Sequence, residues 1–115
     1  MPRSQRLFLQ DIKESAAAIF DYTQGLDFQG FTQDRKTYSA VIREFEIIGE
    51  AVKHLPPETI NSYTQVHWRD IKDFRNLLIH EYFGVDFEIV WNTIWQDLPV
   101  LQKVVDQMIC NYSTE

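Results

Sequence analysis

The chain has 115 residues, of which 44% are hydrophobic and 14% aromatic, and its formal net charge is −6. A chain of this length builds one domain around an apolar core, so we expect a single helical domain over residues 1–115. The acidic balance argues against a protein that coats nucleic acid, which needs a basic surface. It is compatible with an enzyme that has a small, locally basic cleft, or with a protein that binds a basic partner.

No apolar run approaches the roughly 18 residues that a membrane span needs, and the N-terminal residues lack the apolar block of a signal peptide. We therefore expect a cytoplasmic protein. The lone cysteine, Cys110, cannot form an internal disulfide. The three histidines, His54, His67 and His80, lack the spacing of metal ligands, so we expect no metal and no cofactor.

Apolar residues recur at steps of three and four through most of the chain, which predicts helices. The first helix is expected from Arg6 to about Gln24, and Gly25 and Gly30 bracket the short connection after it. The second is expected from about Arg35 to His54, with Asp34 as its N-cap.

Pro56-Pro57 ends the second helix, and residues 58–63 are expected to form a turn or a short helix. A third helix begins near Trp68. Asp86 is the expected N-cap of a fourth helix, and Pro99 predicts a break near Asp97, which is expected to cap a final helix. No segment alternates at period two for long enough to predict a strand, so the pattern indicates a small antiparallel helical bundle.

The third helix carries a stretch, residues 73–83, in which an arginine, a histidine and a tyrosine interrupt the apolar pattern. Arginine binds phosphate through a fixed fork of donors, and histidine transfers protons near neutral pH. Metal-free RNA cleavage needs a base for the ribose 2′-hydroxyl, an acid for the departing 5′-oxygen and a cation beside the phosphorus. Arg75 could supply the cation and His80 the proton, so the stretch suggests phosphate chemistry.

Helix geometry places these residues unevenly. Arg75 and Tyr82 share one stripe, and Asn76 and His80 share the adjacent one. Arg75 and His80 lie about 140° apart and would not face one point on a straight helix, although the long arginine side chain or a looser helix near Gly84 would relieve this. Two proton-transfer roles and one motif histidine indicate two copies of the motif, brought together at the cleft of a two-fold dimer.

Two carboxylates are candidate supporting residues. Glu50, in the middle of the second helix, would orient Arg75 or Asn76, or would be an ordinary surface glutamate. Asp73 would support the motif, or would form an inert ion pair with a neighbouring cation. The Arg-x4-His spacing by itself also fits a solvated arginine and a structural histidine.

Two strings of the sequence resemble signatures of one family. Val41 to Ala51 ends in Ile-Gly-Glu-Ala, and Trp68 to Val85 contains Arg75-Asn76-x3-His80-x-Tyr82. The first looks like the Leu/Ile-Gly-Glu-Ala signature, and the second like the Arg-x4-His-x-Tyr motif, of the HepT-like family. That family belongs to the HEPN superfamily of small helical ribonucleases. The likeness covers about Leu9 to Leu101, which is nearly the whole chain.

The resemblance implies an all-α, antiparallel up-and-down bundle of four to five helices that forms a homodimer through the motif face. Arg75 and His80 would be the catalytic pair of a metal-independent endoribonuclease with an RNA substrate. The protein would be the toxin of a toxin–antitoxin pair, with a small nucleotidyltransferase of the MntA type as antitoxin. That partner would inactivate the toxin by AMPylation of Tyr82.

Two other functions stay open at this point. The chain could be a non-catalytic helical partner, or the substrate-binding subunit, of a nucleotidyltransferase, in which case the motif would bind phosphate without cutting RNA. It could also be a plain helical interaction module with the motif as a polar interface patch.

Overall fold

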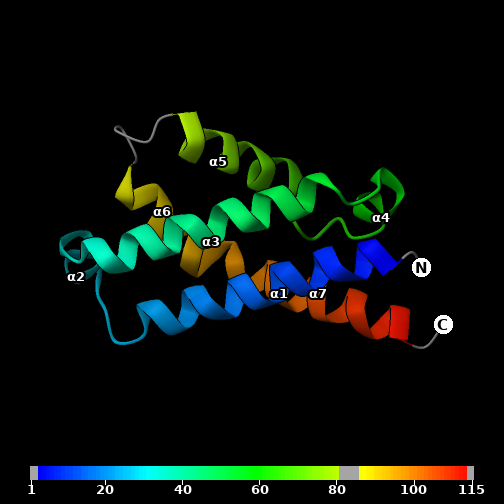
Figure 1. The fold of residues 1–115 in the computed structure, drawn as a ribbon, viewed down its shortest axis with the longest axis horizontal. Helices are drawn as coiled ribbons and strands as arrows, with labels where there is room; N and C mark the ends of the chain where they lie inside the picture. The colour runs from blue at the N-terminus through cyan, green and yellow to red at the C-terminus, as the bar shows by residue number, and fades with distance from the viewer. Residues whose placement is uncertain (1–2, 81–85, 114–115) are drawn as a thin grey trace.

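The computed structural model describes residues 3–80 and 86–113, with side chains for 5–74 and 86–111, and these residues are all-α (Figure 1). The expectation of an all-α fold is confirmed. The described residues form seven helices where four to five were expected: α1 (Arg3–Thr23), α2 (Phe28–Gln33), α3 (Arg35–Lys53), α4 (Pro57–Asn61), α5 (Trp68–His80), α6 (Phe87–Gln96) and α7 (Leu98–Ser113).

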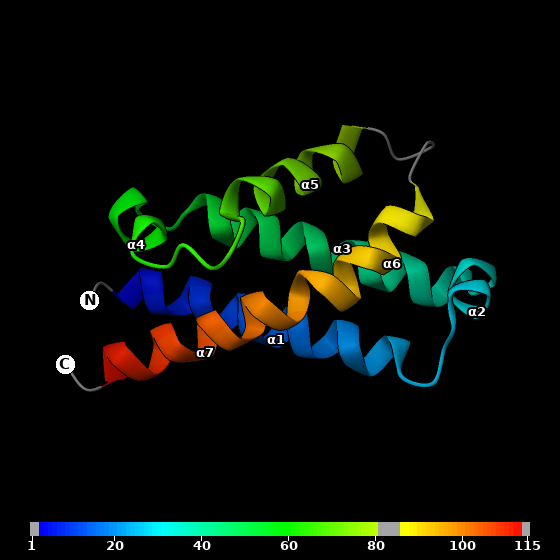
Figure 2. The same ribbon diagram turned by 180° about the vertical axis from the view of Figure 1, so that it is seen from behind.

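The longer helices run up and down against one another (Figures 1 and 2). Helix α1 packs against both α3 and α7, α5 packs on α3, and α6 leads into α7. The two ends of the chain lie at the same end of the bundle, and α5 runs away from that end (Figure 1). The expected antiparallel arrangement is therefore present, and the two additional helices, α2 and α4, are short elements in its connections.

The core forms where the apolar stripes of the helices meet, as amphipathic helices require. In α1 the buried positions follow steps of three and four residues, and α3, α6 and α7 contribute matching stripes. Fully buried side chains of these four helices include Leu9, Ile12, Ile19, Val41, Ile48, Ile94, Leu101 and Met108.

The prediction that the segment after the first helix is a plain connection was wrong, because it contains α2. Gly25 has a φ of +80°, which glycine adopts at little cost, and the chain turns there after α1. Asp27 then caps α2, since its Oδ1 accepts a hydrogen bond from the Gly30 backbone N–H at 2.7 Å. Phe31 of α2 is fully buried against the rings of Tyr38, Phe87 and Trp91, so tertiary packing stabilises a helix too short to persist alone.

The N-caps predicted at Asp34 and Asp86 are confirmed. Asp34 Oδ1 accepts from the Thr37 backbone N–H at 3.1 Å, and its Oδ2 accepts from the Thr37 hydroxyl at 2.8 Å. These bonds hold the pKa of the Asp34 carboxyl below its ordinary value. Asp86 Oδ1 accepts from the Glu88 backbone N–H at 2.9 Å and starts α6.

The predicted break before Pro99 is also confirmed. Helix α6 ends at Gln96, and Asp97 joins it to α7, because its N–H donates to the Thr93 carbonyl and its carbonyl accepts from the Leu101 N–H. Pro99 lies in the first turn of α7, where a missing N–H costs no helical hydrogen bond.

The start of α5 is fixed by Trp68, whose side chain is 6% exposed and whose Nε1 donates to the Tyr63 carbonyl at 2.8 Å. We expect Trp68→Phe to lower the free energy of unfolding by about 1–2 kcal/mol, because it removes this hydrogen bond and part of a buried ring. Urea denaturation measures the change. The matched control, Trp95→Phe, alters a side chain that is 46% exposed and should cost less than about 0.5 kcal/mol; equal losses in both variants would contradict the assignment.

Candidate active site

One continuous helix, α5, carries four predicted site residues, namely Asp73, Arg75, Asn76 and His80. The side chains of Arg75, Asn76 and His80, like the whole of Tyr82, lie outside the described residues. Helix α5 is α-helical through His80, so the loosening expected near His80 is absent up to that residue. The roles of Arg75, His80, Asn76 and Tyr82 therefore stay predictions, now attached to a defined helix.

Helix α5 is positioned chiefly by its contact with α3. Phe74 packs edge-to-face on Phe45 of α3, with ring centroids 5.0 Å apart, and Ile71 also packs on the core. The loop before α5 is tied to α7, because Asn111 Nδ2 donates to the Tyr63 hydroxyl at 2.8 Å. Side-chain packing, this loop contact and the Trp68–Tyr63 hydrogen bond therefore set the position of α5 ahead of the motif.

The regular helix keeps the motif positions apart. Five residues rotate the chain by about 500°, so Arg75 and His80 leave the α5 axis about 140° apart. A reaction centre that needs both groups at one phosphate is therefore better satisfied by two copies of α5 than by one. This supports the expected homodimer, which stays a prediction.

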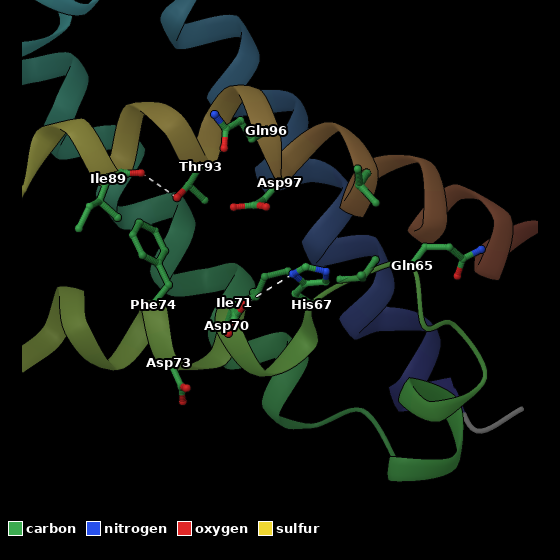
Figure 3. A pocket seen from close by; sticks show the side chains of 12 residues that line it. Gln65, His67, Asp70, Ile71, Asp73, Phe74, Ile89, Thr93, Gln96 and Asp97 are labelled. Atoms are coloured by element: carbon green, nitrogen blue, oxygen red, sulfur yellow. Dashed lines mark hydrogen bonds and ion pairs between the residues drawn. The ribbon is translucent and has the colours of Figure 1, made fainter.

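A groove runs between α5 on one side and α6 with the start of α7 on the other (Figure 3). Its volume is about 630 Å³. Ile71 and Phe74 line it from α5, and Ile89 and Val100, which are 44% and 40% exposed, line it from α6 and α7. The groove thus begins on the helix that carries the motif, and its floor is apolar.

Carboxylates surround this apolar floor. Asp70, Asp73 and Asp97 are lining residues, all three exposed. The Asp70 carboxylate lies 3.5 Å from His67 Nδ1. Figure 3 shows Asp97 between α6 and α5, whereas Asp73 points outward from α5. The described lining residues include no lysine or arginine, so the groove favours a cation over a phosphate.

The two predicted supporting carboxylates occupy different surroundings. Glu50 lies in α3, its side chain is about half exposed, and its Oε1 is 3.3 Å from His54 Nε2. The expected contact of Glu50 with Arg75 or Asn76 stays a prediction. Asp73 lies in α5 at the edge of the groove, and no ion pair joins it to another residue of the described segments.

The contribution of the loop before α5 and of α6 and α7 to this region was not predicted from the sequence. His67, for which the sequence predicted only that it binds no metal, lines the groove and pairs with Asp70. A useful signal was available, because Ile89 and Val100 fall off the buried stripes of their helices, where an apolar residue is unexpected.

Groups of three or more metal-ligating side chains are absent from residues 5–74 and 86–111. Among the helices in the part of the chain that the structure describes, none combines the length and the apolar character needed to cross a bilayer.

Comparison with known proteins gives one family and several relatives. Residues 12–108 match the model of a family described as "Ribonuclease HepT-like". A Methanocaldococcus jannaschii protein named "Putative RNase MJ0127" is 44% identical over 110 residues, which cover 95% of this chain and 91% of that protein. A Thermococcus cleftensis protein named "Probable ribonuclease HepT" is 41% identical over 108 residues, covering 94% and 98%. No solved structure matches the chain.

Proposed function

Because this chain belongs to the HepT-like ribonuclease family, we propose that it is a metal-independent endoribonuclease in which Arg75 and His80 cut RNA at the cleft of a homodimer. The observation that carries the proposal is the placement of both residues on α5, a continuous helix whose start and middle are held by Trp68, Ile71 and Phe74. A reaction that depends on geometry needs its groups on such a rigid element.

The proposed reaction needs two proton transfers and one positive charge that stabilises the phosphoryl oxygens. One imidazole takes the proton of the ribose 2′-hydroxyl as that oxygen attacks the phosphorus, and a second imidazole gives a proton to the departing 5′-oxygen. The Arg75 guanidinium stabilises the negative charge that builds on the phosphoryl oxygens. The bond from phosphorus to the 5′-oxygen breaks, which leaves a 2′,3′-cyclic phosphate and a 5′-hydroxyl. Each chain has one motif histidine, so the two roles require two chains.

The proposal includes regulation through Tyr82. The protein acts as the toxin of a toxin–antitoxin pair, and a cognate nucleotidyltransferase transfers AMP to the Tyr82 hydroxyl. A phosphate attached two residues beyond His80 would compete with RNA for Arg75, and its negative charge would repel the RNA backbone. The support for this part is the position of Tyr82 within the family motif.

We expect Arg75→Ala and His80→Ala each to lower the rate of RNA cleavage by at least about 100-fold, because each removes a group that acts in the transition state. Cleavage of a fluorescent single-stranded RNA measures the rate, with and without EDTA, and wild-type cleavage should persist in EDTA. Lys103→Ala, at an exposed position of α7, is the control and should cleave normally. Unchanged cleavage by both motif variants would contradict the catalytic assignment.

The alternative function, a non-catalytic partner of a nucleotidyltransferase, predicts different properties for the same variants. A non-catalytic partner of a nucleotidyltransferase would form a stable complex with that enzyme, would cleave no RNA at any pH, and would need Arg75 but not His80 for the complex.

We expect a mixed dimer of one wild-type chain and one His80→Ala chain to cleave RNA about as slowly as the His80→Ala homodimer. The proposed reaction needs one imidazole from each chain and this dimer lacks one of them, whereas a site within each chain would leave about half of the wild-type rate. Differently tagged chains, purified through both tags, allow the rates to be compared. A rate near half of the wild type would show that the two chains do not share a site.

We expect co-expression with the cognate nucleotidyltransferase to raise the mass of the protein by whole multiples of an AMP unit, and Tyr82→Phe to abolish this increase because it removes the acceptor oxygen. Intact-protein mass spectrometry measures the change. Tyr63→Phe is the control, since Tyr63 lies in the loop before α5 and its hydroxyl already accepts a hydrogen bond from Asn111. A mass increase that survives in Tyr82→Phe would place the modification elsewhere.

A further inference from the structure

The charged residues of α5 are divided between two sides of the helix. Arg69 and Lys72 are exposed and three positions apart, so they are neighbours on the helix surface. Asp70 and Asp73 are also exposed and border the groove toward α6 and α7, although the Asp73 side chain points outward from α5 (Figure 3) and lies four positions from Arg69. Helix α5 therefore has a basic side at Arg69 and Lys72 and an acidic edge toward the groove, although the whole chain is acidic.

Helix geometry orders these positions relative to the motif. Around the α5 axis, Lys72 lies between Arg69 and Arg75, about 60° from each, whereas Asp73 and Asp70 follow on the opposite side of Arg69. Along the axis, Lys72 precedes Arg75 by about 4.5 Å and Arg69 precedes it by about 9 Å. The two cations thus form a slanted row that leads to Arg75.

Arg69 and Lys72 are available for a ligand. The ion pairs within the described segments involve other cations, namely Lys13, Arg43, His54 and His67. An anion that approaches the basic side would meet two charged side chains before it reaches the motif. On the groove side it would meet the carboxylate of Asp70, whose side chain is 77% exposed, and this negative charge disfavours phosphate.

We infer that Arg69 and Lys72 bind backbone phosphates of the RNA next to the cleavage site and guide the strand along the basic side of α5 to Arg75. This inference rests on the proposed function for its substrate class. The two residues act in substrate binding: they lie at least one helical turn from His80 and take no part in proton transfer. Because a single strand releases counterions as its phosphates are neutralised, their contribution depends on salt.

The test compares two double variants with the same change in net charge. Arg69→Gln/Lys72→Gln removes the row, and Arg6→Gln/Lys103→Gln removes one arginine and one lysine from exposed positions of α1 and α7. The binding probe is a short single-stranded 2′-O-methyl RNA, which lacks the free 2′-hydroxyl and cannot be cleaved by the proposed reaction. Fluorescence anisotropy gives Kd over a salt series, and an unmodified RNA of the same sequence gives KM and kcat.

We expect the row variant to raise Kd and KM about tenfold, with kcat within about twofold of the wild type. The slope of log Kd against log salt should become shallower by roughly 0.7 for each lost phosphate contact. The control variant should change Kd by less than about twofold. Equal weakening in both variants, or an unchanged salt slope in the row variant, would overturn the inference, as would a defect confined to the binding of a protein partner.

The binding arm separates this inference from the proposed function. Wild-type protein that binds the 2′-O-methyl RNA through Arg69 and Lys72 but never cleaves the unmodified strand would overturn the catalytic proposal and uphold the binding row. If the wild-type protein cleaves RNA with the same KM as the Arg69→Gln/Lys72→Gln variant, the catalytic proposal would stand and the inference about Arg69 and Lys72 would be overturned.

Discussion

The contact between α5 and α3 is the interaction on which the site depends. Helix α5 has its main helix–helix contact with α3, through Ile71, Phe74 and the Phe45 ring, and the same two α5 side chains border the groove toward α6 and α7. Packing on α3 fixes the direction of the residues of α5, while the adjoining groove can admit a ligand or another chain. Trp68 joins the start of this helix to the Tyr63 loop, and that loop is joined to α7.

Much of the fold could be predicted from local signals. Asp34 and Asp86 predict helix starts because a short carboxylate side chain can accept a hydrogen bond from a backbone N–H. Pro99 predicts a helix start because proline is tolerated in the first turn of a helix and not in its interior. Helix α2 could not be predicted in this way, since it is six residues long and is stabilised by the burial of Phe31 among rings from α3 and α6. Such contacts join residues far apart in the chain and leave no periodic pattern in the sequence.

The candidate site was predicted in part. The motif string marks Arg75 and His80 as the proposed catalytic pair, and helix geometry already separates them by about 140°, so the expectation of a second chain also comes from the sequence. The groove could not be predicted from the sequence, because its two walls come from segments about twenty residues apart, and its volume depends on the distance between α5 and α6. The uneven distribution of charge around α5 also could not be predicted, because it is recognised only once the structure shows which side of the helix borders the groove.

The acidic composition and the proposed RNA substrate are reconciled by this local arrangement. A net charge of −6 repels RNA from most of the surface, which lowers non-specific binding. A small row of cations beside the motif can then attract a strand to one place only.

The two ends of the chain lie together at the end of the bundle from which α5 runs away (Figure 1). This arrangement gives an experimenter two equivalent attachment points. An affinity tag, a fluorophore or a surface linker joined to either terminus would lie at the end where α5 begins, and Arg75 follows Trp68 along this helix by about 10 Å at 1.5 Å per residue. Immobilised protein would therefore present its motif-bearing end to the solution.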